Sequence, residues 1–599
     1  MVVDPNGFVS FLSWLPGGLL AWVLIVAIVI GIVTAVAWLV AAIRHGPIAA
    51  IGQTAQLLRG AVIDLVGMSP RRVAALTWLS IKESIRRRVV VVFAIFILVL
   101  SFAGWFLDPG SVNPGRLYLS FVLTATSYLI LLLALFLSSL SLPADIKNRT
   151  LYTIVTKPVR TSEIVLGRIL GFAAVGTCLL LVMGVSCYVF VEKGLWHNHK
   201  ITAKELQPVD ASQGHAAGLR GKTSRVNGHR HVITTNAAGT EGRVETEQGH
   251  WHSLDLKKEG DAVSYELGSP QGQLVARVPL YGKLTFRERD GAEGKGVNVG
   301  DEWDYRSFIE GGTLAAAVWE FDGITEDAFP NGGLPAELFI RIFRTNKGNI
   351  ERGILGNLAV RNPKTGEKVD VRIFESKEDV VDEQFIPREL QTAEGEKRDL
   401  FRDLVDNGKL EIWLKCVEPQ QYFGAARADV YLRAGDASFA LNFAKGYFGI
   451  WLQMLLVIGL GVFFSTFLSG PVAMISTMGA LVGGFYSEFM YKMATGNTFG
   501  GGPAESVVRI LTQINVTNDL EPSLRTTAVV TADRVMGVWL QLMANVLPDF
   551  GKFSFADYVA YGFNISGDTI LTFACRALGF LVPVFVAAYL CLKTREVAK

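Results

Sequence analysis

Seven apolar runs divide the chain. They cover residues 20–43, 89–107, 118–142, 166–191, 447–468, 470–490 and 569–592. Each is close to the roughly 20 residues that an α-helix needs to cross the hydrocarbon core of a bilayer. The pattern predicts an α-helical polytopic membrane protein with about seven spans, in which a long polar block separates the fourth span from the fifth.

The polar block, residues 192–446, has a different periodicity. Short segments in which apolar and polar residues alternate occur at 274–278, 283–286, 338–343, 369–374, 410–414 and 428–432. Turn-forming residues separate them, as at 362–366. This pattern predicts an inserted all-β domain of the sandwich type. The expected domains are an N-terminal span with its linker (1–68), spans two to four (69–191), the β domain (192–446) and spans five to seven (447–599), with an outer connection at 491–568.

Lysine and arginine are distributed unevenly among the connections between the predicted spans. The segments 44–88, 141–168 and 593–599 are rich in them, whereas 1–19 has none and 108–117 has only Arg116. Because cytosolic connections are enriched in Lys and Arg, we expect a cell (inner) membrane protein with its N-terminus outside, its C-terminus in the cytosol and an extracytoplasmic β domain. A cleaved signal peptide is the alternative for the first run, but that run is long and its basic flank follows it.

Composition agrees with this class. The 599 residues are 50% hydrophobic, with a mean hydropathy of +0.34 and a formal net charge of +2. The chain is therefore too apolar for an ordinary soluble multidomain protein and too nearly neutral for a nucleic-acid binder. Its five cysteines form no C-x-x-C pair, so neither a disulfide framework nor redox chemistry is indicated.

A basic amphipathic segment, 69–88, precedes the second span. Ser69 and Pro70 form a typical helix start. Apolar residues at helical spacing make a stripe on an otherwise basic helix; they are Ala74, Trp78, Ile81 and Ile85, and the basic residues include Arg71, Arg72 and Lys82. This pattern predicts a helix that lies in the cytosolic membrane interface. A plain basic cluster that stops translocation is the alternative.

The connection between the third and fourth spans is strongly charged. Residues 145–149 predict a charged helical turn, residues 150–155 offer an apolar face that suits a protein partner, and a helix cap precedes Glu163. We therefore expect a rigid docking element rather than a slack loop. Its candidate contact residues are Asp145, Lys147, Arg149, Thr150, Tyr152, Lys157, Pro158 and Arg160.

Three segments resemble ABC-2 type transporter permeases, including those of the nitrous-oxide-reductase-maturation and gliding-motility type. The stretch 144–168 is similar to their coupling segment, 71–88 to their elbow helix, and 546–562 to the stretch before their last span. The resemblance implies a dimer of permease subunits, identical or different, that docks two cytosolic ATP-binding subunits through the coupling segment. The expected function is ATP-driven transport, with export as the expected direction. The first span and the long insertion depart from the six-span family pattern.

A nucleotide site is not indicated in the chain itself. A Walker A loop needs G-x-x-x-x-G-K-[ST], and the nearest match, 216–223, has Ala216 in place of the first glycine. We therefore expect no enzyme activity here, with ATP and Mg²⁺ on the partner subunit. The alternative function is a membrane-anchored β domain for envelope adhesion or metal sensing, without transport.

Seven of the eight histidines fall between 197 and 252, and six of them form three H-x-H pairs. The two residues of such a pair share one face of a strand, so two such strands paired in a hairpin would gather four imidazoles, enough for a Zn, Cu or Ni site. A solvated hairpin whose histidines bind water is the alternative. The candidate ligands are His229, His231, His250, His252, His197 and His199.

One charge lies well inside a predicted span, away from its ends. Arg576 is in the seventh run, and Glu488 near the end of the sixth could pair with it. Alternatively, Arg576 extends its guanidinium to the membrane interface.

Overall fold

The computed structural model describes residues 10–86, 89–103, 107–108, 110–111, 113–149, 158–201, 205–209, 218–236, 241–259, 262–299, 306–330, 332–345, 352–378, 381–392, 394–495, 501–515, 518, 521 and 523–594. They form two compact units. The helical unit contains Ser10–Gln273, Phe443–Ala560 and Ile565–Lys599. The β unit contains Leu274–Asn442 and Tyr561–Asn564.

Long apolar helices make up most of the helical unit. Among the described residues, five helices are long and apolar enough to cross a membrane: α1 (Phe11–His45), α5 (Pro114–Lys147), α7 (Thr161–Leu195), α8 (Phe439–Phe467) and α14 (Gly567–Thr594). The other two expected spans correspond to shorter helices, α4 (Val89–Ala103) and α9 (Gly470–Phe485). The membrane class is supported, whereas the number of seven spans stays a prediction.

Several helices lie outside the expected spans or overlap the end of one of them. These are α2 (Pro47–Val66), α10 (Ser487–Ala494), α11 (Pro503–Thr512), α12 (Leu524–Val546) and α13 (Ala556–Ala560). The expected sixth span, 470–490, is interrupted at Tyr486, whose N–H bonds back to the carbonyls of Val482 and Gly483. The apolar run therefore continues beyond the helix that it predicts.

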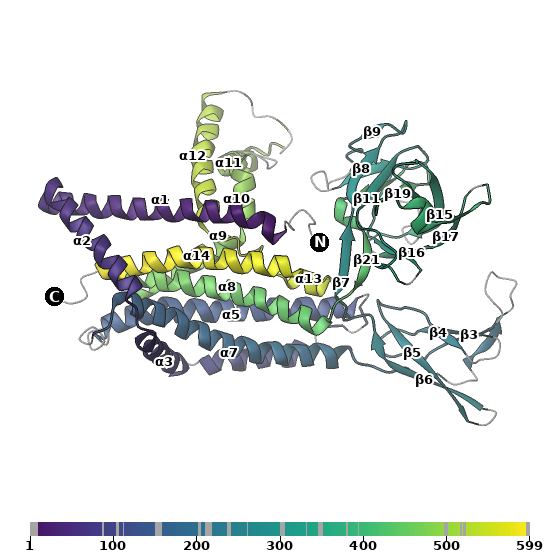
Figure 1. The fold of residues 1–599 in the computed structure, drawn as a ribbon, viewed down its shortest axis with the longest axis horizontal. Coiled ribbons are helices and arrows are strands. Elements are labelled where there is room, and N and C mark those ends of the chain that lie inside the picture. Colours follow the sequence, from purple (N-terminus) through teal and green to yellow (C-terminus); the bar gives the residue numbers. More distant parts are fainter. Residues whose placement is uncertain are drawn as a thin grey trace. The chain divides into compact units, whose positions relative to one another are not determined.

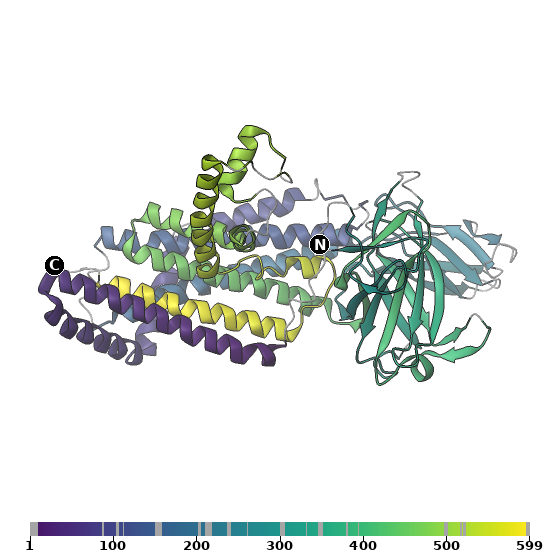
Figure 2. The same cartoon turned by 90° about the horizontal axis from the view of Figure 1, so that it is seen from above.

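Close packing and buried hydrogen bonds join the main helices, which run side by side in Figure 1 and Figure 2. Gly461 of α8 lies so close to α5 that a Cβ there would be 1.9 Å from the Ser138 hydroxyl. Thr126 of α5 and Tyr447 of α8 are hydrogen bonded at 3.2 Å. On the surface of this bundle, Trp22 of α1 donates to the carbonyl of Gly579 in α14 at 2.8 Å.

The β unit is built from antiparallel sheets around one apolar core. Its six-stranded sheet has the order β15-β14-β19-β11-β8-β9, its four-stranded sheet β16-β12-β21-β7 and its three-stranded sheet β10-β20-β13. The core includes the fully buried Trp319 and Phe321. The strands are β7 (Arg277–Tyr281), β8 (Lys283–Arg287), β9 (Glu293–Gly294), β10 (Ser307–Glu310), β11 (Ala316–Phe321), β12 (Gly333–Leu338), β13 (Arg341–Arg344), β14 (Ile354–Arg361), β15 (Lys368–Ser376), β16 (Asp382–Pro387), β17 (Glu389–Gln391), β18 (Lys397–Asp399), β19 (Leu410–Cys416), β20 (Gln421–Ala425) and β21 (Val430–Asp436).

This part of the β prediction is confirmed. The expected turn at 362–366 is present: the Asn362 side chain accepts from the N–H groups of Lys364 and Thr365, and Gly366 has a φ of 74°. A left-handed conformation of this kind favours glycine.

The first part of the polar block belongs to the helical unit instead. We call residues 196–273 the histidine module. One sheet has the order β1-β2-β3-β4, with β1 (Gln207–Val209), β2 (Gly218–Lys222), β3 (Val232–Asn236) and β4 (Gly242–Val244). β5 (Trp251–Glu259) and β6 (Ala262–Gln271) form a hairpin. The block that we expected to be one domain, 192–446, is thus divided between the two units.

Candidate metal centre

Six histidines converge inside the histidine module. His197 and His199 lie on the segment that follows α7, His229 and His231 precede β3, and two more lie at the start of β5. All six are buried, with exposed fractions of 0–6%; the last two are His250 and His252. In five of the six, the ligand nitrogens all lie within 4.8 Å of one another; His229 is not one of these five. The predicted convergence of the H-x-H pairs is therefore confirmed.

Two similar tight turns deliver four of these rings. Asn227 and Gly228 have φ values of 48° and 83°, and Gln248 and Gly249 have φ values of 49° and 71°. Two successive positive φ values define the tightest hairpin turn, which favours an Asn-Gly type sequence. Each turn is closed by a bridge, Val226 with His229 and Glu247 with His250. The H-x-H pair follows directly, so both of its rings point the same way.

Backbone carbonyls hold the Nδ1 atoms of the rings. The Nδ1 atom of His197 lies 2.9 Å from Leu195 O, that of His199 2.8 Å from Ser224 O and that of His231 3.0 Å from Glu245 O. The same contact measures 2.8 Å from His252 to Gly268 O and 3.3 Å from His229 to Asn227 O. A carbonyl oxygen only accepts, so Nδ1 carries the proton and Nε2 of the neutral ring carries a lone pair.

His250 is held differently. Its Nδ1 is 3.5 Å from the Gln248 carbonyl and 3.0 Å from the side-chain amide of Gln273. The amide oxygen of Gln273 is buried without a hydrogen bond. Rotating this amide by 180° presents its oxygen to Nδ1, so Gln273 also suits a ring protonated at Nδ1.

The lone pairs meet at the centre of the module. Nε2–Nε2 distances are 3.0 Å for His197 with His250 and for His199 with His229. They are 3.2 Å from His250 to His229 and to His231. Nε2 of His252 is buried and has no hydrogen-bond partner. Lone pairs this close repel one another, so a cation bound between them would stabilise the arrangement.

Burial favours the neutral form of five rings: His197, His199, His231, His250 and His252. It lowers the pKa of His250 to about 3, with the neighbouring imidazoles His231, His197 and His229 adding to the effect. Burial likewise lowers the pKa values of His199, His231 and His252 to about 4 and also lowers the pKa of His197. Near neutral pH these nitrogens are therefore free to act as ligands, as metal binding requires.

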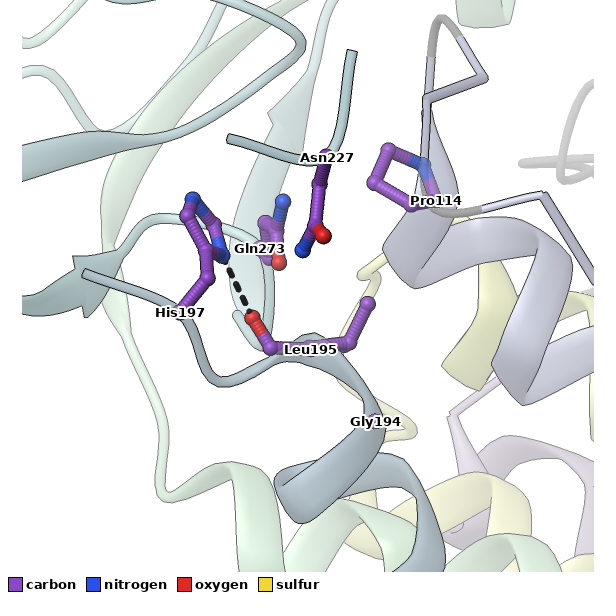
Figure 3. A pocket seen from close by; sticks show the side chains of 6 residues that line it. All are labelled: Pro114, Gly194, Leu195, His197, Asn227 and Gln273. Carbon is purple, nitrogen blue, oxygen red and sulfur yellow. Dashed lines mark hydrogen bonds between the residues drawn. The ribbon is translucent and has the colours of Figure 1, made fainter. Parts of the chain in front are cut away.

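The centre is attached to the ends of two long helices. His197 lies just beyond the last residue of α7, and Figure 3 shows its ring bonded to Leu195 beside Pro114, the first residue of α5. Asn227 and Gln273 line the same pocket. Gln248 donates to the carbonyl of Gly110, which precedes α5, at 2.9 Å. The sequence predicted the histidines but not the polar residues around them, Asn227, Gln248 and Gln273. Their contacts depend on where the backbone runs, which the sequence pattern does not show.

The candidate coupling residues lie at the other end of the same helices. α5 continues through Pro143 to Lys147, so the predicted charged helical turn is present. Lys147 and Arg149 are exposed, as is Pro158. Asp145 is paired with Arg168 of α7. Thr150, Tyr152 and Lys157 lie outside the described residues.

The basic segment 69–88 forms the helix that we expected there, α3 (Pro70–Arg86). It packs on α7, where Leu76 and Ser80 lie against Gly167 and Gly171. Val73, Ser80 and Ser84 are its buried residues, whereas Trp78 is 59% exposed. Lys82 lies over the Trp78 ring at 5.5 Å, and Arg71 is exposed. The apolar stripe that we predicted is thus not the face that packs on α7; it is largely open to the surroundings, as an interfacial helix requires.

Arg72 joins α3 to the start of α7. It donates to the fully buried Glu163, with 2.7 Å from Nη2 to Oε1 and 2.8 Å from Nε to Oε2. The N–H of Ser69 donates to the same carboxylate at 2.8 Å, and that of Arg160 at 3.0 Å. Sequence reasoning treated Glu163 only as part of the helix start and missed this junction.

Of the two alternatives for Arg576, the pair with Glu488 is not formed. Glu488 is bonded to Lys492, one helical turn away, at 3.1 Å. Arg576 instead lies over the rings of Trp14 and Phe573, at 5.4 and 5.1 Å. The interruption at Tyr486 places Glu488 in a separate short helix, which explains why its partner is local.

Comparison with family models, with curated proteins and with solved structures found no match to this chain.

Proposed function

We propose that this chain is a membrane protein that holds a divalent transition-metal ion in the histidine module. The observation that carries the proposal is the meeting of six buried imidazoles with their Nε2 atoms facing one another. Imidazole is the commonest metal ligand in proteins, and its orientation is usually set by a hydrogen bond from the other ring nitrogen. Backbone carbonyls provide that hydrogen bond here.

A merely structural cluster is disfavoured by its own chemistry. An imidazole in a core normally uses both nitrogens in hydrogen bonds. Five rings commit their proton to a backbone carbonyl, so the 3.0 Å contact between Nε2 of His199 and Nε2 of His229 has no proton to share. The three Nε2 contacts of His250, at 3.0–3.2 Å, lack a proton as well when the Gln273 amide oxygen faces Nδ1 of His250. A bound cation removes this repulsion and satisfies the buried Nε2 of His252 at the same time.

The test is the metal content of the purified full-length chain. We expect about one transition-metal ion per chain after removal of loosely bound metal, and its loss when His250 and His252 are both replaced by Gln. His45→Ala is the matched control, because His45 ends α1 and lies outside the cluster. Wild-type protein that binds no transition metal when titrated with Ni²⁺, Co²⁺ or Zn²⁺ would refute the proposal.

We further propose that the chain works as the permease subunit of an ATP-driven transporter of the ABC-2 type. The contacts around the candidate coupling segment support it. Glu163 ties α3 to the start of α7, and Arg168 pairs with Asp145 at the end of α5 and with Glu83 of α3. A force applied to the exposed Lys147 and Arg149 would therefore reach three helices together.

In this proposal a separate cytosolic subunit binds ATP and Mg²⁺ and presses on the segment between α5 and α7. A second permease subunit, identical or different, completes the transporter. The histidine module and the β unit then lie outside the cell membrane. An adhesion or metal-sensing protein without transport is the competing function.

Capture of the ATP-binding subunit tests this second proposal. The tagged chain, isolated from its own membranes, should retain an ATP-binding subunit, and the double variant Lys147→Glu and Arg149→Glu should lose it. Lys193→Glu is the control, since it makes one charge reversal of the same kind near the other end of α7. Equal recovery of ATPase with all variants, or none with the wild type, would favour the competing function.

A further inference from the structure

We infer that all six Nε2 atoms bind one ion in an octahedral field, so that the centre takes a six-coordinate divalent ion of the Fe²⁺, Co²⁺ and Ni²⁺ class. The inference rests on the proposed metal-binding function and deepens it by naming the class of ion. It goes beyond the presence of a histidine cluster, because a site of four imidazoles would suit a different ion.

The rings are arranged like the corners of an octahedron. Each ring has four others at centroid distances of 4.7–5.4 Å, with interplanar angles of 70–88°. The one ring that is not its neighbour is its opposite corner. The three opposite pairs are His197 with His231, His199 with His250, and His229 with His252. Every H-x-H pair therefore occupies two adjacent corners, as its spacing on one chain segment requires.

The distances between ligand atoms favour the same geometry. At a metal–nitrogen distance of about 2.1 Å, adjacent ligands are about 3.0 Å apart in an octahedron and about 3.4 Å apart in a tetrahedron. The four short Nε2–Nε2 distances are 3.0, 3.0, 3.2 and 3.2 Å. All four join corners that the ring arrangement makes adjacent. The arrangement of the rings and the distances between their nitrogens thus agree.

The type of ligand limits which metal ions the site can bind well. Six neutral imidazoles contribute no charge and no oxygen, so hard ions such as Mg²⁺ and Ca²⁺ are poorly matched. Zn²⁺ in structural sites is almost always bound by four ligands in a tetrahedron, and Cu²⁺ favours a tetragonal field. Fe²⁺, Co²⁺ and Ni²⁺ accept imidazole, and Ni²⁺ is the tightest of these three in the usual order of affinities.

A six-coordinate site is also closed. Catalytic metal sites keep a position open for water or substrate, whereas all six corners here are occupied by side chains. The ion would therefore link three chain segments rather than activate a substrate. These are the segment after α7, the turn before β3 and the start of β5.

X-ray absorption of the full-length protein loaded with Ni²⁺ or Co²⁺ tests the inference. We expect six nitrogen neighbours at one distance and the weak visible absorption of six-coordinate Co²⁺. Four nitrogen neighbours, or the intense visible bands of tetrahedral Co²⁺, would overturn the octahedral inference and leave metal binding intact. Failure to bind either ion or Zn²⁺ would overturn metal binding as well. This measurement needs only the wild-type chain, so misfolding of a variant cannot obscure it.

Single substitutions give a second test. His229→Gln removes a ligand that a four-coordinate site made from the other five histidines would not need. We expect it to weaken Ni²⁺ binding by about tenfold or more and to leave five nitrogen neighbours. The control, His45→Ala, should bind like the wild type. Unchanged Ni²⁺ affinity in the folded His229→Gln protein would also overturn the inference.

Discussion

At the scale of single residues, what matters most in this molecule is which atom carries a proton. The carbonyls of Leu195, Ser224 and Glu245 fix the tautomer of three imidazoles and so turn their lone pairs inward. Burial works in the same direction, because it disfavours the charged ring. The side chains of the centre are visible in the sequence, but the backbone atoms that make them ligands are not.

In the β unit, the amine of Lys368 is expected to lose its proton at an unusually low pH. Burial, and next the charge of Lys415, lower the pKa of Lys368 to about 8. The folded state therefore disfavours the charged amine, and this cost is present in full below pH 8 and disappears as pH rises to the unfolded value of about 10.4. The charged amine also lies 4.5 Å from the centre of the Trp413 ring, which offsets part of this cost. We therefore expect Lys368→Met to raise the stability of the β unit at pH 7 by about 1 kcal/mol. The gain should vanish near pH 10.5.

Thermal unfolding followed by tryptophan fluorescence measures this gain. Lys364→Met is the matched control, because Lys364 is 72% exposed and makes only a 3.9 Å ion pair with Asp406. Its stability should change little, as expected for an exposed pair. A stabilisation by Lys368→Met that is the same at pH 7 and pH 10.5 would contradict the assigned pKa.

At the scale of elements, the junction of α3 with α7 depends on one carboxylate and on two close helix contacts. A Cβ at Gly167 would lie 2.6 Å from the Leu76 Cβ, and one at Gly171 would lie 2.4 Å from the Ser80 Cβ. The two helices can therefore approach only because these residues are glycine. Glu163 then meets Arg72 and the N–H of Ser69 at the end of this contact.

Glu163→Gln should loosen this junction. The amide keeps the shape but loses the charge that Arg72 and two N–H groups bind, so we expect a local cost of about 1–3 kcal/mol. Hydrogen exchange in α3 should accelerate by roughly tenfold. Glu192→Gln is the control, since Glu192 is exposed on the same helix. If exchange in α3 is unchanged, the carboxylate does not hold the elbow helix.

Helix α3, the long spans and the turn at 362–366 were predictable because each follows from local periodicity or capping. The packing face of α3 was not, since small residues such as Ser80 and Ser84 form it and hydrophobicity alone selects Trp78. The ion pair that we considered between Arg576 and Glu488 is absent, because the sixth span does not continue past Tyr486 as one helix. The H-x-H pairs predicted that histidine side chains converge. That the pair His197 and His199 joins the other two pairs depends on where α7 ends, which the sequence does not show.

At the scale of the whole molecule, α5 and α7 are joined near both ends. Arg168 and Asp145 pair at one end, and the histidine module meets Leu195 and Pro114 at the other. The helices are 34 and 35 residues long, which is about 50 Å at helical rise. An ion in the module would therefore restrain the same pair of helices that the proposed ATPase would move.

Removal of the ion should loosen one end of this helix pair and leave the β unit unchanged. Hydrogen exchange of the full chain, with and without a strong chelator, should show faster exchange in residues 196–201 and 226–252 and in the first turns of α5. β14 and β19 should not respond, because they belong to the β unit with its own core. Addition of Ni²⁺ should restore the protection. Equal acceleration in β19 would mean that the chelator destabilises the whole chain, and no acceleration around His229 and His250 would mean that the ion does not join these segments.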